Sequence, residues 1–149
     1  MRIRALAVMT MVGVVSAAPL AAPLQLKDLP AAVQKTVQDN LKSGQIKSIE
    51  KETEGGIDQY EIETVVNGKA RDFNVDTKGA LLVVEEETTI DALPEGAKAT
   101  ILKRVGGGTL GVIESVQSTG KPVTYEVAFR DKGGKKHSVV VNADGTDAK

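Results

Sequence analysis

One pattern of apolar residues and turns occurs twice in this chain of 149 residues, and it limits the folds that the chain can adopt. Leu29-Pro30 recurs 64 residues later as Leu93-Pro94. Tyr60-Glu61-Ile62 recurs as Tyr125-Glu126-Val127, now 65 residues later, because a loop between them has gained one residue. Repetition at a fixed period indicates copies of one supersecondary unit. We therefore predict two units, 29–87 and 93–146.

Each unit combines a helical period with a strand period. The apolar residues first recur at every fourth position and then alternate, which predicts one helix followed by antiparallel strands. The expected strands are 46–53, 58–66, 69–76 and 81–86 in the first unit, and 110–117, 123–130 and 135–142 in the second. Almost no chain is left after Gly145, so the second unit should have a shortened last strand.

The predicted fold class is α+β, with two tandem helix-plus-antiparallel-sheet repeats and a sheet that is open on one face. A unit of this length is marginally stable by itself. We therefore expect the two copies to pack against each other, and one continuous sheet would achieve this.

The first residues have the order of a secretory signal peptide. Basic Met1–Arg4 is followed by apolar Ala5–Val15 and by the small residues Ser16-Ala17-Ala18. We predict a signal peptide at 1–17 and a flexible segment at 18–28. The protein would then be periplasmic or secreted from a bacterium.

An uncleaved membrane anchor is the alternative interpretation of this segment. Ala5–Leu24 carries no charge and approaches the ~20 residues that span a bilayer. However, Pro19 and Pro23 interrupt its second half. We favour cleavage, and therefore predict no stable membrane insertion of the mature protein.

Residue counts exclude several kinds of site. The chain has no cysteine, which excludes disulfides, thiolate metal ligands and a cysteine nucleophile. With His137 as the one histidine, a zinc site built on several histidines is also excluded. The formal charge is −1 and the aromatic residues are few, so no nucleic-acid surface is expected. We predict no cofactor, no metal and no nucleic-acid partner.

Several motifs together resemble a PepSY-like repeat pair. They are Tyr60-Glu61-Ile62, Asn67-Gly68 and Phe73-Asn74-Val75-Asp76 with Gly79, and a looser second copy that ends at Val141–Gly145. The resemblance implies a helical segment against an antiparallel sheet, repeated in tandem, similar in fold to the β-lactamase-inhibitor protein. PepSY domains also occur in propeptides of secreted metallopeptidases. The resemblance therefore implies a secreted binding or inhibitory module, without naming its target.

The sheet face away from the helices should be polar, because residues that alternate with the core point there. The candidate partner-binding residues on it are Glu61, Glu63, Asp72, Glu126, Arg130 and Lys136. A merely solvated surface is the simplest interpretation, and acid–base work on a glycoside would need aromatic residues that this face lacks. Residues 27–90 carry a net charge of −5 and residues 91–149 carry +2, which leaves a docking surface for a basic partner as a third interpretation.

No other set of residues in the sequence indicates a catalytic site. His137 follows Lys135-Lys136, and no Gly-x-Ser-x-Gly motif supplies a nucleophile for it. Glu85-Glu86-Glu87 cannot converge on a metal, since neighbouring strand residues point to opposite faces, and we expect a solvated strand end.

We therefore predict a non-enzymatic protein-binding module. An envelope or secreted peptidase is one candidate partner, which the protein would inhibit or regulate. The alternatives are an ion-binding protein, and a structural envelope protein that self-associates through a sheet edge.

Overall fold

The computed structural model describes residues 23–148, so the predicted signal peptide lies outside the described part. Two short 3-10 turns, two helices and seven strands follow one another along the chain. They are η1 (Leu26–Asp28), α1 (Ala31–Asn40), β1 (Gln45–Glu54), β2 (Ile57–Val66), β3 (Lys69–Asp76), β4 (Leu81–Glu87), η2 (Ile90–Ala92), α2 (Glu95–Val105), β5 (Thr109–Ser118), β6 (Thr124–Arg130) and β7 (Lys136–Asn142). The strands lie within two residues of the positions that alternation predicts.

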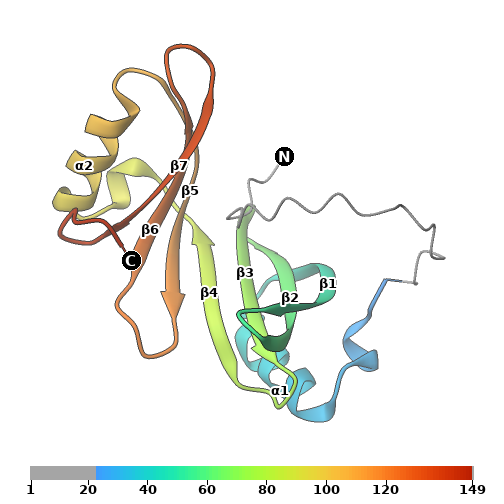
Figure 1. Cartoon of the computed structure of the whole chain (residues 1–149). Coiled ribbons are helices and arrows are strands. Elements are labelled where there is room, and N and C mark those ends of the chain that lie inside the picture. The colour runs from blue at the N-terminus through green and yellow to red at the C-terminus, as the bar shows by residue number, and fades with distance from the viewer. Residues whose placement is uncertain (1–22, 149) are drawn as a thin grey trace, which may run out of the picture.

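All seven strands belong to one antiparallel sheet, in the order β1-β2-β3-β4-β5-β6-β7. The predicted fold class, two tandem helix-plus-antiparallel-sheet repeats, is therefore wrong, because the structure is one seven-stranded antiparallel sheet with two helices. The overturning feature is the pairing of β4 with β5, from Val83↔Ser118 to Glu87↔Glu114. In Figure 1, β4 lies between the group β1–β3 and the group β5–β7. The division into units 29–87 and 93–146 stays a prediction.

Both helices begin directly after a proline, at Pro30 and Pro94, whose missing N–H costs nothing at a helix start. Each helix presents an apolar stripe, with Val33 and Val37 buried in α1, and Ala97, Ile101 and Val105 buried in α2. Helix α2 ends at Gly106, which adopts the left-handed conformation of a helix C-cap.

The two helices cover the same face of the sheet. Helix α1 packs on β3, and α2 packs on β6 and β7. Cross-strand partners lie on the same face of a sheet. The pair Phe73↔Val84 continues the face beneath α1 onto β4, and the pair Ser115↔Tyr125 continues it from β5 to the strands beneath α2. Among residues 23–148, no helix lies on the opposite face of the sheet, which we call the open face.

Two separate apolar clusters lie beneath the helices. One gathers Leu29, Val33, Val37, Ile49, Tyr60, Ile62, Phe73 and Val75, and the other gathers Leu93, Ala97, Ile101, Val105, Ile113, Val127, Phe129, Val139 and Val141. No residue belongs to both clusters. Part of the segment 18–28, which we expected to be flexible, contributes to the first cluster, because Leu24 and Leu26 pack against it.

The sheet has two edges, β1 and β7. The chain end covers part of β7, since Val141 bridges to Asp147 and the N–H of Ala148 donates to the carbonyl of Val140. The edge that the shortened last strand was expected to expose is therefore partly closed. Among the described residues, no helix is long and apolar enough to span a bilayer.

Candidate functional site

Acidic side chains form two rows across the open face. In the first row Glu63 on β2 faces Asp72 on β3, and Asp72 faces Glu85 on β4. In the second row Glu87 on β4 faces Glu114 on β5, and Glu114 faces Glu126 on β6. Glu61 lies next to the first row and faces Glu50 on β1. We call these eight residues the carboxylate ladder.

The ladder places like charges directly opposite one another. Side chains at facing positions of an antiparallel pair lie about 5 Å apart at Cβ, and like charges there are destabilising. Five such pairs of carboxylates occur across the sheet: Glu50↔Glu61, Glu63↔Asp72, Asp72↔Glu85, Glu87↔Glu114 and Glu114↔Glu126. This concentration of charge is not required by the fold, because any polar side chain would suit an uncovered face.

Local hydrogen bonds hold several ladder residues in place. The Oδ1 atom of buried Asp72 accepts the backbone N–H of Thr64 at 3.0 Å. The hydroxyl of Ser48 donates to Glu63 Oε2 at 2.5 Å, and the N–H of Ala70 donates to Glu87 Oε2 at 3.3 Å. These bonds fix Glu63 and Asp72 in the first row and Glu87 in the second, so each row contains a carboxylate of defined position.

Glu85 occupies the middle of the ladder and is partly buried. Burial, followed by the negative charges of Glu114, Glu126, Asp72 and Glu61, raises the pKa of Glu85 to about 7. Burial also raises the pKa of Glu126. The expected solvated strand end is therefore wrong for Glu85, which carries only part of its charge near neutral pH.

Of the predicted partner-binding residues, Glu61, Glu63, Asp72 and Glu126 belong to the ladder. Arg130 and Lys136 face each other at the far end of β6 and β7. There the Arg130 guanidinium donates to the carbonyl of Gly134 at 3.0 Å. The structure thus groups the acidic candidates and separates them from the two basic ones.

Sequence reasoning missed Glu85 and Glu114 as members of this group. The sequence of β4 does not alternate there, because four apolar residues precede three glutamates. The closeness of Glu85 and Glu114 depends on the β4–β5 pairing, which the sequence analysis did not assign.

His137 lies on the helix side of β7, away from the ladder. Its ring stacks on Phe129 with centroids 5.2 Å apart, and its Nε2 atom lies 2.9 Å from Asp131 Oδ2. The hydrogen bond from His137, followed by backbone hydrogen bonds, holds the pKa of the Asp131 carboxyl below its usual range. These contacts hold the His137 ring at the rim of the sheet.

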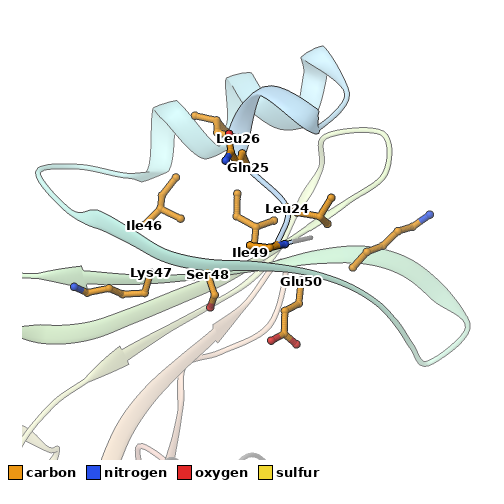
Figure 2. A pocket seen from close by; sticks show the side chains of 10 residues that line it. Leu24, Gln25, Leu26, Ile46, Lys47, Ser48, Ile49 and Glu50 are labelled. Carbon is orange, nitrogen blue, oxygen red and sulfur yellow. The ribbon is translucent and has the colours of Figure 1, made fainter. Parts of the chain in front are cut away.

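A groove of about 870 Å³ lies along the edge strand β1. Figure 2 shows Leu24, Leu26, Ile46 and Ile49 on its helix side, whereas Ser48 and Glu50 point toward the open face. The pairing of β1 with β2 is irregular between Ile46 and Ser48. A bulge with lysines on an edge strand obstructs the addition of another strand. We therefore regard the open face as the stronger candidate site.

Solved structures share this fold at low sequence identity. A "putative periplasmic" protein from Bacteroides eggerthii DSM 20697 aligns with a TM-score of 0.68 and 13% identity, over 81% of this chain and 86% of that chain. A DUF2874 family protein from Bacteroides ovatus ATCC 8483 gives 0.65 and 12%, over 81% and 85%. A BLIP-like protein from Bacteroides fragilis NCTC 9343 gives 0.62 and 16%, over 81% and 84%.

No protein-family model matches the chain, and no curated protein matches it. The resemblance to the β-lactamase-inhibitor protein is confirmed at the level of the fold, whereas the PepSY assignment stays a prediction. At these identities the solved structures show the fold alone: the chain has the BLIP-like fold.

Proposed function

We propose that the protein is a non-catalytic binding module of the bacterial periplasm or exterior, and that its open face docks a basic surface of a partner protein. The carboxylate ladder carries this proposal. The ladder gathers carboxylates from neighbouring strands on one face of the sheet, and cationic side chains of a partner would complement that negative charge. Since charged groups at fixed positions favour one complementary partner, the ladder would also provide specificity.

The cellular location rests on two supports. The sequence begins with the pattern of a signal peptide, and a structural neighbour is described as periplasmic. Inhibition or regulation of a peptidase rests on the PepSY resemblance and on the BLIP-like name of another neighbour. These supports concern relatives and patterns, so the partner itself has to be found by experiment.

The two alternatives have less support from the geometry. Within residues 23–148, no group of three or more histidine and acidic residues is arranged to hold a metal ion. Self-association through the β7 edge would have to use Lys136 to Val139, because the chain end bonds to Val140 and Val141.

A charge-matched capture experiment tests the docking face. Immobilised protein is exposed to cell-envelope extract, and the bound proteins are identified and their affinity measured with purified components. Glu61→Gln with Glu114→Gln and Glu126→Gln removes three ladder charges. Asp39→Asn with Glu54→Gln and Glu95→Gln removes three charges elsewhere and serves as the control.

The ladder variant should bind its partner at least tenfold more weakly than wild type, and the control should bind within twofold. Equal affinity of the ladder variant and wild type would contradict docking on this face. If the captured partner is a peptidase, its activity should fall as the protein is added in stoichiometric amounts.

A further inference from the structure

The two rows of the ladder meet at the pairing that joins the two halves of the sheet. Glu85 and Glu87 lie on β4, and Glu114 lies on β5. The β4–β5 pairing consists of five residue pairs, whereas β2 and β3 share eight. The apolar clusters on either side have no residue in common. The stability of this short pairing therefore depends on backbone hydrogen bonds and on the few side chains that face each other across it.

Carboxylates from four other strands act on Glu85. Asp72 faces it directly from β3, Glu61 acts on it from β2, Glu114 from β5 and Glu126 from β6. Within residues 23–148, the charged side chains that shift its titration are acidic. Its neighbour on the same strand, Glu87, also lies on the open face. The geometry therefore disfavours a full negative charge at this position.

The adjacent residue on β4 has the opposite environment. Glu86 points to the helix side, where its Oε1 atom accepts hydrogen bonds from Lys42 Nζ at 3.0 Å and from Arg71 Nε at 2.7 Å. The hydrogen bond from Lys42 and, next among the lowering contacts, that from Arg71 hold the pKa of Glu86 below its usual range. The pKa is therefore raised for Glu85 and lowered for Glu86, although the two glutamates are adjacent on one strand.

We propose that the junction of β4 and β5 is a proton-sensitive seam: uptake of one proton by Glu85 strengthens the pairing of the two halves and lowers the negative charge of the docking face. The second effect rests on the proposed function, because it concerns affinity for a basic partner. Acidification would make the protein more stable and at the same time weaken its hold on that partner.

The direction in which stability changes with pH follows from the direction of the Glu85 pKa shift. The pKa of Glu85 is higher in the folded protein than in the unfolded chain, so the folded state binds the proton more tightly. The added stability is complete below the unfolded-state pKa and is lost as the pH rises through about 7. Most carboxylates that accept hydrogen bonds in the folded state have a lowered pKa, so their contribution to stability is lost as the pH falls.

Urea unfolding of the purified protein between pH 5 and pH 8.5 tests the seam without any partner. For wild type, we expect the folding equilibrium constant to fall by roughly 10- to 100-fold over this range. Glu85→Gln should remove most of that fall and should be more stable than wild type at pH 8.5. Glu86→Gln changes the neighbouring position and should keep the wild-type slope, because Glu86 is ionised over the whole range.

An unchanged pH slope in Glu85→Gln would overturn the proposal. Should that variant fail to fold, carbon-13 NMR of the wild-type side chain gives the answer directly. A titration midpoint of Glu85 between pH 6 and pH 8 supports the seam, and a midpoint below pH 5 overturns it. If the wild-type protein shows no pH slope although the ladder charges affect partner binding, the seam is refuted and the docking face stands. If the wild-type protein shows the pH slope but the ladder charges do not affect partner binding, the docking face is refuted and the seam stands.

Discussion

The two halves of the sheet attach their helices through the same contact. In the N-terminal half, the Thr36 hydroxyl on α1 donates to the carbonyl of Gly79 at 2.6 Å. In the C-terminal half, the Thr100 hydroxyl on α2 donates to the carbonyl of Gly145 at 2.9 Å. Each glycine lies in the turn that follows the strand beneath its helix. The halves therefore use one way of anchoring a helix to a sheet, although their strands belong to one continuous layer.

The halves differ where a basic side chain covers an aromatic ring. Arg71 on β3 is buried over Phe73 at 5.4 Å, and its guanidinium donates to Glu86 and to the carbonyl of Asn40, both at 2.7 Å. His137 on β7 stacks on Phe129 at the edge of the sheet, where its side chain keeps 35% of its surface exposed.

The position of the strand explains this difference. Strand β3 has neighbours on both sides, so β4 and the end of α1 supply acceptors for a buried guanidinium. Strand β7 has one neighbour, and water reaches the histidine from the other side. A buried charge is tolerated only where the surrounding elements satisfy its hydrogen bonds. The continuous sheet thus lets the N-terminal half bury a charged side chain at this position, whereas the corresponding side chain of the C-terminal half stays partly exposed.

Core truncations at matched positions should have the largest effects. Ile62 and Val127 are both fully buried, one in each apolar cluster. We expect Ile62→Ala to lower the free energy of unfolding by about 3–4 kcal/mol and Val127→Ala by about 2 kcal/mol, measured by urea unfolding. Each half alone is marginal, so both variants should unfold in one transition. Two separate transitions, seen by fluorescence and circular dichroism, would contradict a shared folding unit.

The double variant sharpens this comparison. Because the two clusters share no residue, the losses should add to within about 0.5 kcal/mol. A coupling energy above about 1 kcal/mol would show that the sheet transmits packing changes between the halves.

Substitutions of Arg71 and His137 should have the next largest effects on stability. Arg71→Met removes donors from the carbonyl of Asn40 and from Glu86, and should cost about 3 kcal/mol in the free energy of unfolding. His137→Gln removes a partly exposed contact and should cost under about 1 kcal/mol. Thermal and urea unfolding measure both. Similar losses for the two variants would contradict the difference between an interior and an edge strand.

Substitutions in the two turns that accept the threonine hydrogen bonds test the helix anchoring that the halves share. Gly79 and Gly145 have φ of +93° and +85°, and a Cβ would meet Ala32 at 2.9 Å in the first case and the Gly96 carbonyl oxygen at 2.3 Å in the second. We expect alanine at either position to cost about 2 kcal/mol or more in stability. Gly120→Ala is the control, since its φ is +74° with open space around it, and should cost about 1 kcal/mol. Equal losses at all three sites would leave only the backbone conformation as the cause.

Local patterns in the sequence predicted the elements well, because they depend on neighbouring residues. The four-residue period of Val33 and Val37 and the alternation around Phe73 indicate a helix and a strand without knowledge of the rest of the chain. The cores under the helices follow from the same periods. What the sequence left open is which strand pairs with which across the boundary of the two units.

The main error lay at that boundary. Strand β4 consists of four apolar residues followed by three glutamates, and β5 carries a single acidic residue, so neither pattern identifies the strand that it pairs with across the boundary. Without the β4–β5 pairing, Glu85 was taken as part of a solvated strand end and Glu114 was left out of consideration. With the sheet continuous, both residues enter the ladder, and the burial of Glu85 follows from neighbours that are distant in sequence.

Acid titration of the two helix-side ion pairs should give the smallest effects. The pKa values of Glu86 and Asp131 are both lowered by their partners. Their contributions to stability are therefore present above the unfolded-state pKa and are lost as the pH falls through the folded-state pKa. At pH 6, Glu86→Gln should cost about 1 kcal/mol, because its partner Arg71 is buried although Glu86 itself is 44% exposed. Asp131→Asn should produce a smaller fall in the urea midpoint, and both losses should shrink as the pH falls through the folded-state pKa of each carboxyl. A larger loss for Asp131→Asn would mean that water at the edge does not weaken the histidine pair, and the contrast between the interior and edge strands would then need another cause.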